Sequence, residues 1–329
     1  MSVTVKDIAD RANVSTATVS RALNPEQTGI KPEVRNEIVA LAERMGYKKR
    51  GRKSNKTDNA YVGIIYKREP TTFASGGVLG DRLYHAMEIS LYHQGKQALM
   101  HNIALDDEPP AFLKDGLVSG VLLVELDIDN DHKILKELKQ MKIPAVAVNH
   151  PGYLDNFDVV SVNYVQCYQL MAKRLLEKGC QNIAFASNDF GHFVTRNSFL
   201  GYSLAMFETG KTPQETTWLK ESDSADVGKE IAREIVADGT IDGVLCMSNK
   251  IAKNIIAELQ ALGKKVPGDV KVCGFDPSSK DDTAITAAIY NLPEMTDRAV
   301  ELLQYRSVKP KVNPVKLTTY CTIQDGDSD

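Results

Sequence analysis

The sequence predicts an α/β protein in which a small three-helix head precedes a two-lobed body of doubly wound parallel sheets. The charges divide the chain in the same way. The 329 residues have a formal net charge of -3, but residues 1–56 carry twelve Lys and Arg against six Asp and Glu. From residue 61 onward, short β-rich apolar runs alternate with longer helical stretches, which is the pattern of parallel α/β architecture. A basic head on an acidic body is typical of a protein that contacts a polyanion at one end.

The head is expected to contain three short helices. Residues 7–12 and 15–23 form the first two, and the tight link between them needs a positive φ, which Asn13 tolerates well. Ser15 is a suitable N-cap for the second helix, and Pro32 lies in the first turn of the third. This arrangement predicts a helix-turn-helix unit whose second helix enters a major groove. The alternative is a structural three-helix cap with a solvated basic face.

Residues 48–60 are polar and basic and have no apolar period, so they are interpreted as a linker. Gly51 weakens any helix in this run. Two hypotheses stay open for it. In the first, Lys49, Arg50 and Arg52 lie extended in a narrow, A·T-rich minor groove. In the second, the run is a tether held near phosphates only by its charge.

The body is expected to form two lobes that share a cleft. Strands are predicted at 62–66, 98–103, 120–124, 145–149, 182–186, 243–247 and 270–275. Helices are predicted at 81–94, 131–141, 165–178, 196–208, 226–238, 250–262 and 294–305. A break at 149–152 divides two similar halves. Ligands of open α/β sheets bind beyond the carboxyl ends of the strands, so the two lobes should present their strand-end loops to one site.

The residues VTVKDIADRANVSTATVSRALN and the following Gly46-Tyr47 resemble the head of the LacI/GalR family of transcription regulators. Three later segments, 143–149, VPGDVKVCGFD and NLPEMTDRAVELL, resemble landmarks of the family's effector domains. The resemblance implies a periplasmic-binding-protein-like body with three crossovers between its lobes. The expected domains are a helix-turn-helix domain at 1–47, a hinge at 48–60 and an effector-binding and dimerisation domain at 61–329. Lobe 1 is expected at about 61–159 plus 291–315, and lobe 2 at about 160–290 plus 316–329.

The resemblance also implies which residues touch DNA. Thr16 and Ala17 match the family's base-reading pair, and Arg21 would reach a guanine or the nearby backbone. The positions that match phosphate contacts are Ser15, Thr18, Ser20, Asn24, Ile30, Lys31 and Tyr47. The family's hinge usually wedges a leucine into the minor groove, but no leucine lies between Tyr47 and Tyr61.

Effector contacts carried over from the family are Asn149, Asn249 and Asp276, each at or just past the end of a predicted strand. Amides and carboxylates suit sugar hydroxyls, and the candidates for an aromatic platform are Phe190, Phe193 and Trp218. The alternative for any one of these Asn or Asp residues is a turn or helix-capping role. The sequence differs from the family's usual pattern at two effector-binding positions. Ser198 occupies the place of the usual arginine, which Arg196 would replace, and Lys250 stands where the family usually has Asp.

The segment between residues 103 and 120 is shorter than in most of the family and in this resembles the galactose and β-galactoside regulators, which favours a galactose-like effector. The expected protein is a cytoplasmic repressor of carbohydrate-utilisation genes. It would act as a homodimer on double-stranded operator DNA, with no cofactor, metal or membrane partner. The acidic segment 324–329 contains no heptads, which argues against a tetramer built by a terminal coiled coil. Induction and co-repression stay open.

Two other functional classes, an enzyme and a secreted solute-binding protein, are alternatives to a transcription regulator. The sequence lacks the GxGxxG, GxxxxGK[ST], GxSxG and HExxH motifs, so we expect no enzyme. A secreted solute-binding protein needs a signal peptide, which residues 1–15 do not resemble, and no apolar run is long enough to span a bilayer. The five cysteines form no CxxC pair and are interpreted as reduced packing residues.

Overall fold

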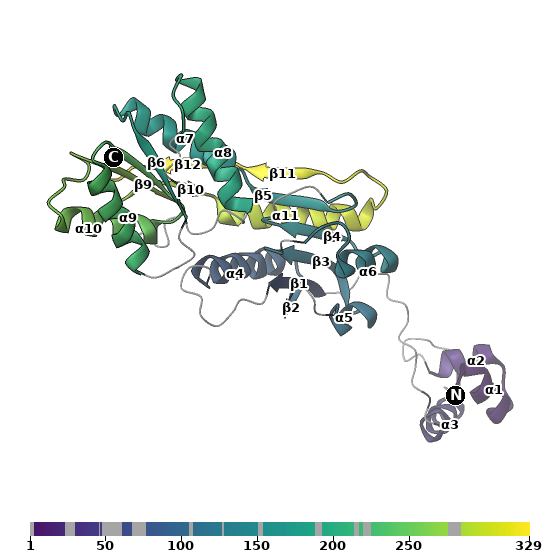
Figure 1. The fold of residues 1–329 in the computed structure, drawn as a ribbon. Coiled ribbons are helices and arrows are strands. Elements are labelled where there is room, and N and C mark those ends of the chain that lie inside the picture. The colour runs from purple at the N-terminus through teal and green to yellow at the C-terminus, as the bar shows by residue number, and fades with distance from the viewer. Residues whose placement is uncertain are drawn as a thin grey trace. The chain divides into compact units, whose positions relative to one another are not determined.

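The computed structural model describes residues 3–23, 30–45, 47, 61–67, 77–104, 108–126, 128–150, 154–187, 193–213, 217–219, 225–275 and 284–329. The chain divides into two compact units, residues 1–55 and residues 56–329 (Figure 1). Each unit is described by itself.

The first unit is a small bundle of three helices: α1 (Val5–Ala12), α2 (Thr16–Ala22) and α3 (Pro32–Arg44). Its core consists of one small apolar cluster: Ile8, Ala9, Val19, Ala22, Ile38 and Ala42. A reciprocal cap between Thr4 and Asp7 begins α1, because the Thr4 amide donates to Asp7 at 2.7 Å and the Asp7 amide donates to Thr4 at 3.3 Å. The predicted turn is confirmed, since Asn13 has φ 53° and ends α1 in the left-handed region.

The second unit contains two six-stranded sheets, each belonging to one lobe. The first sheet has the order β11-β5-β4-β3-β1-β2 and is parallel throughout. Its strands are β1 (Tyr61–Lys67), β2 (Gln97–Ile103), β3 (Val118–Val124), β4 (Ala145–Val148), β5 (Asp158–Val162) and β11 (Lys316–Thr319). Its helices are α4 (Gly77–His93), α5 (Ala111–Lys114), α6 (Lys133–Met141) and α11 (Leu292–Val308).

Alternating side chains of the first sheet bury its two faces against different helices. On β1, Ile64 packs in the core with α4 and α11, whereas its neighbour Ile65 packs in the core with α5 and α6. This alternation is the period of two expected for a strand covered on both sides.

The second sheet has the order β12-β10-β9-β8-β6-β7, and its strands are parallel except for the antiparallel pair β10–β12. Its strands are β6 (Ile183–Ser187), β7 (Thr217–Leu219), β8 (Gly243–Cys246), β9 (Lys271–Phe275), β10 (Thr286–Tyr290) and β12 (Cys321–Gln324). Helices α7 (Tyr164–Glu177) and α8 (Phe193–Glu208) cover one face, and α9 (Ala225–Asp238) and α10 (Asn249–Ala261) cover the other (Figure 1).

The predicted fold class is confirmed and so is the expected lobe boundary at 290/291, but the other two expected boundaries are wrong by several residues. The boundary at 159/160 falls inside β5, and the boundary at 315/316 assigns β11 to lobe 2. Both strands belong to the first sheet, because β5 pairs with β4 and β11 pairs with β5. The chain therefore passes between the lobes at residue 163, at residue 291 and at residue 320.

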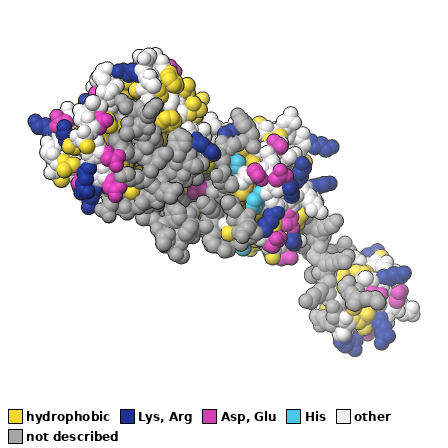
Figure 2. Space-filling model, in the orientation of Figure 1, with side chains coloured by type: hydrophobic (Ala, Val, Ile, Leu, Met, Phe, Trp, Pro, Cys, Tyr) yellow, Lys and Arg dark blue, Asp and Glu magenta, His cyan; other side chains and the backbone are white. Residues whose placement is uncertain are grey.

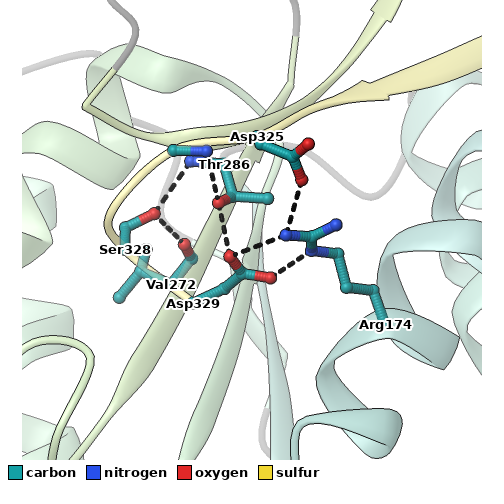
Figure 3. A network of polar contacts seen from close by, with 7 residues as sticks. Arg174, Val272, Thr286, Asp325, Ser328 and Asp329 are labelled. Carbon is teal, nitrogen blue, oxygen red and sulfur yellow. Dashed lines mark hydrogen bonds and ion pairs between the residues drawn. The ribbon is translucent and has the colours of Figure 1, made fainter.

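Residues 325–329 are bound to β9, β10 and α7 by a partly buried polar network (Figure 3). Asp329 accepts hydrogen bonds from Arg174 of α7 and, at 2.6 Å, from the Thr286 hydroxyl of β10. The Ser328 hydroxyl accepts from the Thr286 amide at 2.9 Å and donates to the Val272 carbonyl at 2.6 Å. Arg174 also pairs with Asp325 at 2.7 Å.

The interpretation of all five cysteines as reduced residues is wrong for one pair. Cys167 of α7 and Cys321 of β12 form a disulfide, which joins two segments 154 residues apart in sequence. Cys180, Cys246 and Cys273 are free and buried, as packing residues would be. Burial raises the pKa of the Cys180 thiol to about 11, so this thiol stays protonated at neutral pH.

No helix within the described part of the chain is both long and apolar enough to cross a membrane.

Candidate nucleic-acid interface and effector site

Helix α2 presents a polar face to solvent on the side away from the core of the head. Val19 and Ala22 are buried in that core. Four other residues of the helix are exposed: Thr16, Ala17, Ser20 and Arg21. A short helix with one buried edge and small exposed side chains can approach a nucleic-acid groove closely.

The start of α2 is held by the predicted cap. The Ser15 side chain accepts a hydrogen bond from the Thr18 amide at 3.1 Å, and the hydroxyls of Ser15 and Thr18 lie 2.8 Å apart. The first turn therefore carries two exposed or half-exposed hydroxyls beside its free amides, a combination that favours a phosphate oxygen.

The other predicted DNA contacts are distributed as follows. Ile30 and Tyr47 pack against the head core while keeping part of their surface exposed, and Lys31 is exposed just before α3. The Tyr47 amide donates to the Ala42 carbonyl at 2.9 Å, which fixes the residue that follows α3. The remaining predicted contacts, Asn24, Lys49, Arg50 and Arg52, lie outside the described residues.

In the second unit, a group of polar and aromatic side chains lies between the two lobes. Asn149 follows β4 with φ 54° and is buried. Its amide nitrogen donates to Glu125 at 3.0 Å, and its amide oxygen accepts from the Tyr164 hydroxyl at 2.9 Å. Tyr164 is the first residue of α7, so Asn149 joins the first sheet to the first helix of lobe 2.

Tyr164 also contacts aromatic rings of lobe 2. Its ring centroid lies 6.1 Å from that of Phe193 at the start of α8 and 5.7 Å from that of Phe275 at the end of β9. Phe193 was a candidate from sequence, but Tyr164 was missed. The signal for it was weak, because a tyrosine at the start of an apolar helix is usually a core residue.

A cavity of about 280 Å³ opens beside Tyr164 and Phe193 and has walls from both lobes. Its polar lining is formed by His150, Ser161, Asn163, Asn197, Lys316 and Thr318. His150 is held in place by a 2.8 Å hydrogen bond between its Nε2 and the Ile128 carbonyl. Burial lowers the pKa of Lys316 from its ordinary value. Among the predicted effector residues that the structure describes with their side chains, only Phe193 lines this cavity, although Asn149 reaches the cavity's Tyr164.

Asn249 is a buried residue whose side-chain amide makes no hydrogen bond to the described residues. It is the first residue of α10, which begins at the Ser248 cap, where the Ile251 amide donates to the Ser248 hydroxyl at 3.3 Å. Both polar atoms of the Asn249 amide are inaccessible to solvent and lack a hydrogen-bond partner among the described residues. Gly274 makes room for it, because any side chain at residue 274 would overlap the Asn249 amide oxygen.

Two further predicted effector residues are separated by the geometry of α8. Ser198 is fully buried, and its hydroxyl faces that of Tyr168. Burial raises the pKa of Tyr168, which stays protonated and donates to the Cys246 carbonyl at 3.1 Å. Arg196 is exposed on the outer side of α8. The expectation that Arg196 replaces an arginine at position 198 is therefore wrong, since two residues along a helix turn the side chain by more than half a revolution.

The remaining effector candidates are not described. Phe190 and Asp276 lie outside the described residues, and of Trp218 the structure gives only its place in β7. Among the described residues, no group of three or more His, Cys, Asp or Glu side chains is placed to hold a metal ion.

Two protein-family models match parts of the chain. Residues 4–49 match the model for bacterial regulatory proteins of the lacI family, and residues 172–328 match that for a periplasmic binding protein-like domain. The chain is 27% identical over 286 residues to catabolite control protein A of Priestia megaterium, covering 84% of this chain and 83% of the relative. It is 25% identical over 336 residues to the HTH-type transcriptional regulator GntR of Escherichia coli (strain K12), covering 98% of each.

Solved structures show the same fold. The Lac repressor bound to ONPG in the repressed state has a TM-score of 0.67 at 16% identity, and all of both chains is covered. A complex of the transcriptional regulator CelR with cellobiose has a TM-score of 0.66 at 20% identity, covering 99% of this chain and 100% of that one.

Proposed function

The chain belongs to the LacI family of DNA-binding transcription regulators, and we propose that it is a cytoplasmic repressor of carbohydrate-utilisation genes whose affinity for its operator changes when a sugar binds between the lobes. The observation that carries this proposal is the exposed face of α2 in the segment matched by the family model. The curated relatives reported above are transcription regulators, which favours this function over a solute-binding protein or an α/β enzyme.

Readout of DNA would begin at α2. Thr16 and Ala17 would contact base edges, and Arg21 would donate two hydrogen bonds to a guanine, the commonest specific contact in a major groove. Ser15, Thr18 and Ser20 would hold phosphates. A single head makes few contacts, so tight binding needs two heads on two half-sites, and we propose a homodimer.

The sugar site would lie between the lobes. The unpartnered amide of Asn249 is the strongest support, because a buried amide without hydrogen bonds costs about 1 to 3 kcal/mol unless a ligand or water satisfies it. Separately, Tyr164 and Phe193 line a cavity with walls from both lobes, whose polar lining includes hydroxyl and amide groups. Such a mixture of apolar walls and a few polar groups is typical of small-molecule sites.

The class of effector is inferred from structural relatives and from the length of the segment after β2. Some structural relatives were solved with sugars, cellobiose in one case and ribose in another. The short segment after β2 resembles galactose regulators, so we propose a galactose-like sugar or galactoside. Asp276 and the aromatic residues Phe190 and Trp218 would complete the site.

The linkage between the two sites follows from the arrangement of the lobes. A sugar that contacts both lobes favours one lobe arrangement, and it can shift DNA affinity only by its difference in affinity for the two arrangements.

The test is fluorescence anisotropy of the full-length protein on labelled DNA from upstream of its own gene, against random competitor at moderate salt. We expect a preferred site and a change in its apparent Kd on adding one member of a panel of mono- and disaccharides. A weaker Kd identifies an inducer, and a tighter Kd identifies a co-repressor. Equal affinity for all double-stranded DNA would refute the proposal.

A further inference from the structure

Strand β11 forms one edge of the first sheet (Figure 1). It pairs with β5, and no other described strand pairs with its opposite side. The carbonyls of Val315 and Thr319 accept hydrogen bonds from amides of β5 and of the residue after it, each at 2.9 Å. Because inward-facing and outward-facing backbone groups alternate along a strand, those of Lys316 and Thr318 point away from β5. The strand therefore presents a backbone edge to which a further strand can add.

Exposed apolar side chains lie beside this edge. Arg306 donates to the carbonyls of Val312 and Asn313, which holds the turn before β11 against the end of α11. Large apolar residues of this helix end, turn and strand are exposed, two of them by 70% or more: Tyr305, Val308, Val312, Val315, Leu317 and Tyr320. An exposed apolar patch of this kind is typical of a surface to which another molecule binds.

The two faces of β11 differ in chemistry. Leu317 pairs in register with Val160, whose side chain belongs to the core that α11 covers, so Leu317 lies on the α11 side of the sheet. Lys316 and Thr318 lie on the other face, where they line the cavity between the lobes. A strand added to this edge would place alternate side chains beside Leu317 and beside Lys316. Its sequence should therefore alternate apolar residues with residues that attract a cation.

The charge along this part of the chain is positive. Residues 305–320 contain no Asp or Glu and four basic residues: Arg306, Lys309, Lys311 and Lys316. Arg306 is paired with the buried Asp158, whereas Lys309 and Lys311 are exposed in the turn before β11. On the face of the molecule drawn in Figure 2, acidic and basic side chains are mixed. A segment with basic charges alone favours a partner that carries negative charge.

We propose that β11 and the turn before it bind an extended acidic segment of a partner protein, which adds to the first sheet as a further strand. In this segment Asp or Glu alternates with apolar residues. Its main chain hydrogen-bonds to the outward backbone groups of Thr318, and its carboxylates meet Lys309, Lys311 and Lys316. A second copy of the same surface is a poor occupant, because it would bring lysines against lysines. The contact uses no residue of α2.

The test is fluorescence anisotropy of a labelled peptide, acetyl-DVEVDIEV-amide, titrated with the full-length protein. We expect saturable binding, and no binding of the counterpart in which Lys replaces every Asp and Glu. Lys309→Glu combined with Lys311→Glu should weaken binding at least about tenfold, because the reversed charges repel the carboxylates. The matched control combines Lys136→Glu with Lys139→Glu in α6, which changes the net charge equally. This control should bind the peptide as the wild type does.

A further variant tests the backbone pairing. Thr318→Pro removes the amide hydrogen that points away from β5, and an edge strand tolerates proline on that side. We expect a Tm close to that of the wild type and peptide binding weakened at least about tenfold. N-methylation of alternate residues of the peptide removes the same kind of hydrogen bond from the partner's side, so it gives the same test on the unaltered protein.

Duplex DNA of random sequence provides the last comparison. If the variant with Glu at 309 and 311 loses affinity for DNA and keeps its affinity for the peptide, the surface contacts nucleic acid and the proposal is wrong. A wild-type protein that does not bind the acidic peptide would also overturn it. So would charge-reversed and proline variants that both bind the peptide as tightly as the wild type.

Discussion

Arg306 of α11 and Asp158 of β5 form a buried, two-pronged ion pair, with Nε–Oδ2 at 2.7 Å and Nη2–Oδ1 at 2.5 Å. The same guanidinium donates to the carbonyls of Val312 and Asn313, and the same carboxylate accepts from the Val315 amide at 2.9 Å. One pair of side chains thereby holds the returning helix, the turn after it and the start of β11 against the first sheet.

Replacing Arg306 with Met should lower the free energy of unfolding by about 3 to 5 kcal/mol, because it leaves the fully buried Asp158 carboxylate without its cation. Urea denaturation of the full-length protein measures the loss. Arg298→Met on the same helix is the control, since Arg298 and Glu301 form an exposed pair whose loss should cost no more than about 1 kcal/mol. Equal losses in both variants would show that burial of the pair contributes nothing.

Acid should weaken the network around Asp329. Burial alone would raise the pKa of this carboxyl, but hydrogen bonds from Arg174 and Thr286 outweigh burial and hold the pKa below its ordinary value. A carboxyl with a lowered pKa in the folded state stabilises the fold above the unfolded pKa of about 3.9. That contribution is lost as the pH falls through the lowered pKa. Asp329→Asn should therefore lower Tm at pH 7 and flatten the fall of Tm between pH 5 and pH 3.

The control for this pH series is Asp327→Asn, because Asp327 is exposed two residues away. Its Tm should follow the wild type at every pH. A wild-type slope in Asp329→Asn would remove the carboxyl of residue 329 from the acid response.

Arg21→Ala should weaken binding to the preferred DNA site by about 1 to 3 kcal/mol and relax the base preference at one position of each half-site. The reason is the loss of a bidentate hydrogen bond to guanine, whereas the phosphate-binding residues remain. Anisotropy on the preferred site and on single-base variants measures both effects. Arg44→Ala, at the end of α3, is the control and should bind as the wild type does. An equal loss of affinity on every sequence would assign Arg21 to the phosphates.

The triple substitution of Lys49, Arg50 and Arg52 by Gln removes three positive charges from the linker. It should weaken binding to all DNA sequences. The slope of log K against log salt should become shallower by about 0.9 for every phosphate that the linker no longer neutralises. A salt titration of the apparent Kd supplies the slope. The control neutralises three lysines of the body, all in or next to α6: Lys136, Lys139 and Lys142. A slope unchanged from the wild type would place residues 48–60 outside the DNA interface.

Asn249→Ala should abolish the thermal shift caused by the effector while leaving Tm of the free protein unchanged or slightly higher. The amide has no hydrogen-bond partner among the described residues, so its removal takes away a desolvation cost and breaks no hydrogen bond to them. Differential scanning fluorimetry with and without sugar measures both quantities. Asn254→Ala, on the same helix, is the control and should retain the ligand shift. A large drop in Tm without ligand would instead give Asn249 a structural role.

The sequence by itself determined the local features of the chain. Asn13 takes the left-handed turn and Ser15 caps α2 because both properties depend on a few neighbouring residues and their side-chain chemistry. The alternation of strands and helices was visible wherever a buried run was long and uniform, as in β3, whose seven residues are all buried. These features follow from hydrophobic period and capping, which act over one or two turns.

The tertiary structure decided what depends on residues far apart in sequence. Strands β5, β7, β10, β11 and β12 were missed because three to five residues of mixed polarity become a strand only when a neighbouring strand satisfies their backbone groups. The same holds for the pairing of Cys167 with Cys321, for the tying of Asn149 to Glu125 and Tyr164, and for the cavity wall at Lys316. The direction of Arg196 was decided by which side of α8 meets α7. Interactions of this kind depend on packing across the whole lobe, so they cannot be predicted from a short segment of sequence.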